Sequence, residues 1–114
     1  MTTKASPDQD FAIITNIGAA VESIPADSIV SRTVYQGPTL RIILFGFAAG
    51  QELSEHTSTK EAILHFLDGQ ARVGLGDSES TTATAGTVIR MRPNLKHSVY
   101  AEQDTRMLLY MIGR

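Results

Sequence analysis

The chain has 114 residues, a length that suits one domain, and its 42% hydrophobic and 19% charged residues are ordinary for a globular protein. The net charge of -2, without a dense run of lysine or arginine, argues against a nucleic-acid surface, because phosphate binding needs clustered positive charge. The absence of cysteine excludes disulfides, thiolate zinc sites and cysteine nucleophiles, and it is compatible with a reducing cytoplasm.

The amino-terminal part of the sequence has no strong secondary-structure pattern. Residues 1–10 are polar and lack the apolar core of a signal peptide, so we expect a flexible tail ahead of a soluble, cytoplasmic domain at 11–114. Residues 11–30 are ambiguous, since their first apolar residues suit a strand whereas Ile17–Ile24 suits a helical turn. No apolar run is long enough to span a bilayer as a helix, so we expect no membrane partner.

From residue 31 onward the sequence has the pattern of short β-strands separated by turn residues. The predicted strands cover residues 32–36, 40–48, 62–67, 71–75, 80–84, 87–92, 97–101 and 106–112. The turn signals between them are Gly37-Pro38, Asp68-Gly69, Gly76-Asp77-Ser78 and Ala85-Gly86. Closely spaced strands with glycine turns are typical of sandwiches and barrels, so the predicted fold is all-β, with one domain and no repeat.

Two of the three histidines lie in segments of similar design. Five residues separate Gly50 from His56, and a predicted strand follows. Later in the chain a strand begins after Gly86, ends at Pro93 and is followed shortly by His97. Both segments therefore combine a glycine, a histidine and a neighbouring predicted β-strand.

These two segments resemble the two motifs of the cupin superfamily, G(X)5HXH(X)3-4E(X)6G and G(X)5PXG(X)2H(X)3N. The resemblance covers about residues 40–112. It implies an RmlC-like jelly-roll β-barrel, also called a double-stranded β-helix. It further implies a metal held by two histidines and one glutamate of the first motif and one histidine of the second. Imidazoles with a carboxylate suit several divalent transition metals.

The match to the metal-binding positions is partial. His56 falls on the first histidine of the first motif and His97 on the histidine of the second. Ser58 stands at the second histidine position and Ala62 at the glutamate position, while Leu95 replaces a glycine of the second motif. Two imidazoles are fewer than the three protein ligands of catalytic zinc or non-haem iron sites. The resemblance thus implies either one weakly held divalent metal (Zn, Fe, Mn or Ni) on these histidines, or none.

The predicted ligand pocket lies inside the barrel around the two histidines. Its residues are His56, Ser58, Ala62, Leu64, Phe66, Met91 and His97. Strand alternation directs the apolar members inward, where such residues most often form only the core. The same alternation directs His65 and Glu55 to the opposite faces of their strands, so neither is expected to join the pocket.

Three functional hypotheses remain open from the sequence. The first is a small cupin that binds a small molecule of unknown identity in the barrel cavity. The alternative is a metal-dependent enzyme of the dioxygenase or isomerase type, with His56 and His97 as ligands and substrate oxygens completing the shell. The third, which is compatible with both, is a homodimer joined through the outer faces of 42–47 and 108–112. The sequence identifies neither a substrate nor a catalytic residue.

Overall fold

The computed structural model describes residues 2–4 and 10–114, and within them it contains eleven strands and one short 3₁₀ helix. In chain order these are β1 (Thr2–Lys4), β2 (Ile13–Thr15), η1 (Ile17–Ala20), β3 (Ile29–Gln36), β4 (Leu40–Phe47), β5 (Glu52–His56), β6 (Glu61–Asp68), β7 (Gln70–Leu75), β8 (Glu79–Thr84), β9 (Val88–Met91), β10 (His97–Ala101) and β11 (Thr105–Ile112). The predicted all-β class is confirmed. No helix in the described part of the chain is long and apolar enough to cross a membrane.

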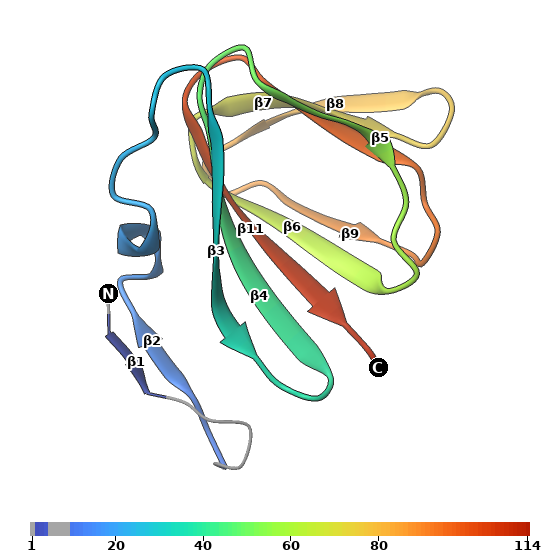
Figure 1. The fold of residues 1–114 in the computed structure, drawn as a ribbon. Coiled ribbons are helices and arrows are strands. Elements are labelled where there is room, and N and C mark those ends of the chain that lie inside the picture. The colour runs from blue at the N-terminus through green and yellow to red at the C-terminus, as the bar shows by residue number, and fades with distance from the viewer. Residues whose placement is uncertain (1, 5–9) are drawn as a thin grey trace.

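Two antiparallel sheets face each other and form the jelly roll (Figure 1). One sheet has the strand order β3-β4-β11-β6-β9, and the other has the order β5-β10-β7-β8. Strands far apart in the sequence are neighbours in each sheet, since β4 pairs with β11 and β5 pairs with β10. The short strands β1 and β2 pair with each other in a separate ribbon beside the larger sheet.

Residue alternation along the strands builds the core between the two sheets. In β6, Ala62, Leu64 and Phe66 are 3%, 2% and 0% exposed, whereas the residues between them are only half-buried. Successive side chains of a strand point to opposite faces, so one face of β6 lines the barrel interior. The buried residues of this core are Phe47, Ala62, Leu64, Phe66, Ala71, Val73, Ala83, Met91, Val99, Ala101 and Met107.

A second apolar cluster covers the outer face of the larger sheet. Leu44 of β4 and Leu108 of β11 are buried there against Val21, which follows η1. The ambiguous residues 11–30 therefore contain both a strand and a helical turn, and they pack on this sheet. Part of the outer face on which we expected a partner subunit is covered by the chain's own amino-terminal segment.

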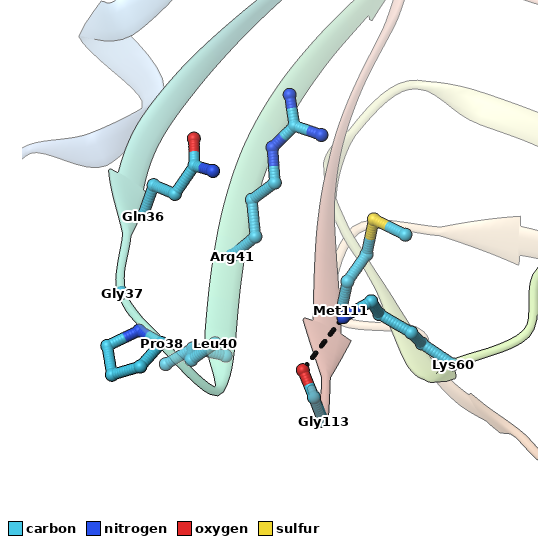
Figure 2. Close-up of a pocket in the computed structure, with 8 residues that line it drawn as sticks. All are labelled: Gln36, Gly37, Pro38, Leu40, Arg41, Lys60, Met111 and Gly113. Carbon is cyan, nitrogen blue, oxygen red and sulfur yellow. Dashed lines mark hydrogen bonds between the residues drawn. The ribbon is translucent and has the colours of Figure 1, made fainter.

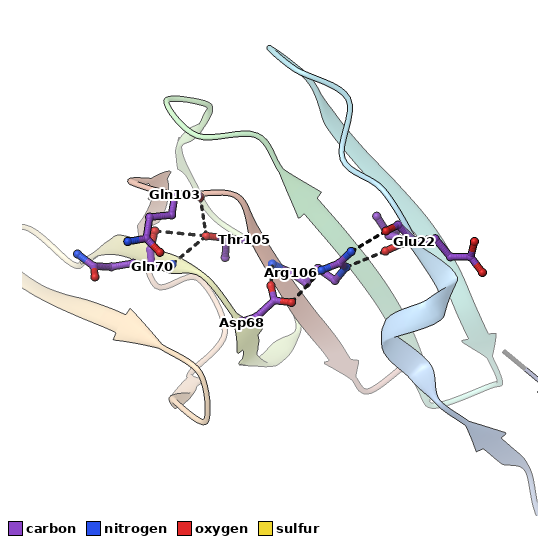
Figure 3. Close-up of polar contacts among 7 residues, drawn as sticks. Glu22, Asp68, Gln70, Gln103, Thr105 and Arg106 are labelled. Carbon is purple, nitrogen blue, oxygen red and sulfur yellow. Dashed lines mark hydrogen bonds and ion pairs between the residues drawn. The ribbon is translucent and has the colours of Figure 1, made fainter.

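Arg106 at the start of β11 fastens that segment to the barrel (Figure 3). Its guanidinium donates hydrogen bonds to the carbonyl oxygens of Val21 and Glu22, at 2.7 and 2.8 Å. It also forms an ion pair with Asp68 at 2.8 Å, and the same carboxylate accepts a hydrogen bond from the Arg106 backbone N–H. Because the fork of an arginine can meet several acceptors at once, one side chain joins the segment, β11 and the end of β6.

The strand predictions hold from residue 29 onward with one omission. The observed strands match the eight predicted ranges to within a few residues, but β5 was not predicted. Its burial pattern explains the omission, since only Leu53 is half-buried and the other four residues are exposed. Of the predicted flexible tail, residues 1 and 5–9 lie outside the described residues, and Thr2–Lys4 forms β1.

Gly69 marks the point where the chain passes from one sheet to the other. It lies between β6 and β7, which belong to different sheets, so the predicted tight turn is not a hairpin. Its φ of 85° lies in the left-handed region, and a Cβ there would collide with the Asp104 carbonyl oxygen and with Thr105. Thr105 is fully buried and hydrogen-bonded to the backbone of Gln70, so it has little room to move (Figure 3).

We expect Gly69→Ala to destabilise the protein more than the same change at two other glycines. Gly50 and Gly86 have similar φ values of 87° and 91°, but a Cβ at either would meet nothing within 4 Å. Their alanine variants should lose about 1–2 kcal/mol through backbone strain alone. Gly69→Ala should lose about 1–3 kcal/mol more through the collision. Urea unfolding of the three variants measures the difference, and equal losses would contradict the steric argument.

Candidate ligand cavity and histidine pair

The pairing of β10 with β5 brings His56 and His97 together. His56 ends β5 and His97 begins β10, and the antiparallel register places the two residues directly opposite each other. The ring centroids are 4.2 Å apart, with an angle of 57° between the ring planes. Side chains of directly opposed residues lie on the same face of a sheet, so both imidazoles stand together at one end of the barrel.

Each imidazole is oriented by a backbone carbonyl two residues earlier in its own strand or loop. His56 Nδ1 lies 2.8 Å from the Ser54 oxygen, and His97 Nδ1 lies 2.9 Å from the Leu95 oxygen. A carbonyl oxygen only accepts hydrogen bonds, so Nδ1 carries the proton in both rings. In the neutral rings, Nε2 then has the free lone pair, which can accept a proton or bind a metal or a ligand.

The two histidines differ in their exposure to solvent. His97 is 7% exposed, whereas His56 is exposed. Burial lowers the pKa of His97 below its ordinary value of 6.5, and the nearby His56 lowers it further, against the opposite effect of the hydrogen bond to Leu95. His97 is therefore neutral at physiological pH, which keeps its Nε2 lone pair available.

A cavity of about 440 Å³ opens beside the histidine pair. Its lining residues are His56, Thr57, Ser58, Thr59, Ala62, His97, Leu109 and Met111. The β5–β6 loop contributes a hydroxyl-rich rim, while β6 and β11 contribute an apolar wall. This combination of an apolar wall with a few polar groups is typical of small-molecule sites, and the volume is in their usual range.

Four of the seven predicted pocket residues line this cavity, namely His56, Ser58, Ala62 and His97. The other three, Leu64, Phe66 and Met91, are at most 2% exposed and belong to the core between the sheets. His65 lies on the opposite face of β6 from the buried residues, as strand alternation predicted. The pocket residues and the core residues differ in their distance from the open end of the barrel. Only the inward-facing residues nearest that end reach the cavity.

Sequence reasoning missed four residues that line the cavity. Leu109 and Met111 are half-buried residues of β11, and their pairing with Leu64 and Ala62 places them on the inner face. Because β11 is apolar on both faces, its sequence does not distinguish these two residues from their outward-facing neighbours. Thr57 and Thr59 lie in the loop after β5, and no periodicity distinguishes them.

Ser58 holds the two loops of the cavity together. Its hydroxyl accepts a hydrogen bond from the Lys60 backbone N–H at 3.2 Å, within its own loop. Its carbonyl oxygen accepts one from the Asn94 backbone N–H at 2.7 Å, in the loop that precedes β10. The residue at the second histidine position of the motif therefore has a structural role in positioning the rim.

The donor set at this site falls short of a complete metal centre. Among the residues that the structure describes, no group of three or more histidine, cysteine, aspartate or glutamate side chains is placed to hold a metal ion. Glu55 is exposed and does not complete the histidine pair. Two imidazole nitrogens leave most of the coordination shell of a divalent ion to water or to a ligand.

Comparison with protein families gives a match over most of the barrel. A model of the cupin domain matches residues 43–113, which include both histidines and all strands from β5 to β11. The matched region thus contains the whole cavity lining described above. No protein of curated function matches the sequence significantly.

Solved structures of similar fold agree with this match. A protein of unknown function from Streptococcus pyogenes is 32% identical, with a TM-score of 0.74 over 81% of this chain and 80% of that one. A cupin superfamily protein from Desulfitobacterium hafniense is 20% identical, with a TM-score of 0.78 over 84% and 87% of the two chains. An RmlC-like cupin from Shewanella frigidimarina is 15% identical, with a TM-score of 0.71 over 75% and 77%.

The lowered pKa of His97 predicts a loss of stability in mild acid. The unfolded chain binds a proton at this residue more readily than the folded chain, so the neutral ring stabilises the fold above about pH 6.5. This contribution is lost as the pH falls through the lowered pKa of the folded state. His97→Asn keeps a donor for the Leu95 carbonyl but does not titrate, so its unfolding free energy should fall less between pH 7.5 and 5.5. Urea unfolding with a chelator present tests this, and an unchanged pH dependence would contradict it.

Proposed function

As this chain belongs to the cupin domain family, we propose that it binds a small molecule in the barrel cavity beside His56 and His97. We further propose that any divalent metal there is bound only weakly. The observation that carries the proposal is the cavity itself, in which two imidazoles oriented by backbone carbonyls meet an apolar wall.

The chemistry of the lining supports binding of a partly apolar molecule. Ala62, Leu109 and Met111 offer apolar surface, and the release of water from such surface favours association. The imidazole Nε2 atoms accept hydrogen bonds from ligand O–H or N–H groups when the rings are neutral. Apolar burial would thus supply affinity, and the two imidazoles would fix the orientation of the ligand.

The limited donor set supports weak metal binding. Catalytic zinc sites normally have three protein ligands, whereas this site offers two imidazoles. Loss of a partner outside the metal's own ligand shell already weakens binding by about 10–100-fold, so the loss of two direct ligands should weaken it more. Among the described residues, the donors at this site thus do not complete a metal centre.

Metal content and thermal stability provide the test of this proposal. Freshly purified protein should contain well below one equivalent of transition metal per chain. Titration with Fe, Mn, Ni or Zn should raise the melting temperature only at metal concentrations well above that of the protein, because stabilisation follows ligand concentration relative to Kd. His56→Ala and His97→Ala should abolish that rise, and His65→Ala, on the outer face, should keep it.

The same measurements decide between this proposal and a metal-dependent enzyme. The adjacent rings with free Nε2 atoms favour that alternative, in which a dioxygenase or isomerase substrate would complete the ligand shell. Near one equivalent of tightly held metal per chain, lost when either His56 or His97 is replaced, would support the alternative and contradict weak binding.

We also propose that the protein is a homodimer. Leu44 and Leu108 are covered by the chain's own segment, so the interface would use apolar side chains that remain exposed, namely Phe11, Ile13 and Ile112 at 62%, 49% and 36% exposed. Replacing Ile112 with Lys should then weaken association without disturbing the buried core. Light scattering at micromolar concentration measures the oligomeric state, and a monomeric wild type would contradict the dimer.

A further inference from the structure

A second cavity, of about 190 Å³, lies between the β3–β4 turn and the end of β11 (Figure 2). Its lining residues are Gln36, Gly37, Pro38, Leu40, Arg41, Lys60, Met111 and Gly113. Met111 lines both cavities, and Lys60 directly follows Thr59 of the first cavity. The two cavities are thus neighbours that share one side-chain wall.

Two cations without an acidic partner characterise this second cavity. Among residues 2–4 and 10–114, neither Arg41 nor Lys60 forms an ion pair. The nearest acidic residue in sequence to Lys60 is Glu61, and its carboxylate is already paired with Arg90 at 2.6 Å. Two positive charges that line one small cavity repel each other, and a bound anion would relieve that repulsion.

Neutral partners hold both cations in place and leave donors free. The Lys60 ammonium donates one hydrogen bond to the Gly113 carbonyl oxygen at 2.9 Å, which is the dashed line in Figure 2. The Arg41 guanidinium donates one to the Thr33 hydroxyl at 3.2 Å. An ammonium has three N–H donors and a guanidinium has five, so most of them remain available to a ligand. A guanidinium is well matched to the planar geometry of carboxylate and phosphate oxygens.

Strand register places Arg41 on the same inner face as the histidine cavity. Arg41 is directly opposite Met111, and Met111 is directly opposite Ala62 on the next strand. Directly opposed residues share a face of the sheet, and adjacent strands are about 4.8 Å apart. Arg41 therefore lies only about 10 Å across the sheet from Ala62, a distance that one small molecule can span.

We propose that Arg41 and Lys60 form an anion-binding subsite, so that the small molecule bound in the barrel carries a carboxylate or a phosphate. The inference rests on the proposed function, because it assigns a chemical class to the ligand of the same barrel. The anionic group would contact Arg41 and Lys60, and the rest of the molecule would pass Met111 and lie beside His56 and His97.

The test uses NMR of the ¹⁵N-labelled protein at constant ionic strength, with three probes. Benzoate has an apolar body and a carboxylate, benzamide is its uncharged counterpart, and inorganic phosphate is the anion alone. Benzoate should shift the amide signals of both cavities saturably, and phosphate should shift only those near Arg41 and Lys60. Arg41→Gln and Lys60→Gln should each lower the affinity for benzoate and for phosphate by at least about tenfold. Hydrogen bonds to charged groups contribute this much binding free energy.

Arg32→Gln is the matched control, because it removes the same charge from an exposed arginine of the adjacent strand. Arg32 is opposite Leu44, so it lies on the outer face. The Arg32→Gln variant should bind benzoate and phosphate with the affinity of the wild type. Equal effects of Arg41→Gln and Arg32→Gln, or the absence of saturable phosphate shifts, would overturn the subsite.

The probes also separate the subsite from the proposed function. Equal binding of benzoate and benzamide at the histidine cavity would overturn the subsite and leave small-molecule binding in the barrel intact. Saturable phosphate shifts near Arg41, with no shift near His56 and His97 from either aromatic probe, would support the subsite and count against the proposed function.

Discussion

The register between β5 and β10 is the constraint on which the candidate site depends. It places His97 opposite His56, and a slip by one residue would turn one of the imidazoles to the other face of the sheet. The edge strand β5 contributes few buried residues, so it cannot set this register alone. The position of β10 is fixed on its other side, where Val99 pairs with Val73 and Ala101 with Ala71, all fully or almost fully buried. Between Val99 and His97 the register with β5 shifts, and this irregularity brings His56 opposite His97.

The same arrangement gives the barrel an electrostatic gradient from its core to its rim. Toward the core the site is apolar, and burial favours the neutral form of His97. At the rim, Arg41 and Lys60 carry charges that no described acidic residue neutralises. A ligand with an apolar body and an anionic end would satisfy both environments. A strongly cationic ligand would satisfy neither, because it would meet like charges at the rim and desolvation further inside.

The sequence predicted the strands that are apolar, that alternate or that are rich in β-branched residues, and it missed the one strand from residue 29 onward that has none of these signals. β7 alternates apolar with polar or small residues, β11 is strongly apolar, and β8 is rich in threonine. β5 was missed because its residues are nearly all exposed, and its presence depends on pairing with β10. The motifs identified His56 and His97, but the distance of a residue from the barrel end is a tertiary property. That is why Leu64 and Phe66 were assigned to the pocket although they lie in the core.

Ala62, at the glutamate position of the motif, bears on both the metal donors and the charged rim. Ala62 lies in one cross-strand row with Met111 and Arg41 on the inner face of the larger sheet. A carboxylate at position 62 would both ligate a metal and stand about 10 Å from the Arg41 position, where it would offset part of that charge. With alanine there, the row contains one cation and no acidic group. Alanine at this position thus removes one donor from the metal-binding set that the motif implies, and it leaves an apolar surface between the histidines and Arg41 for the body of the proposed anionic ligand.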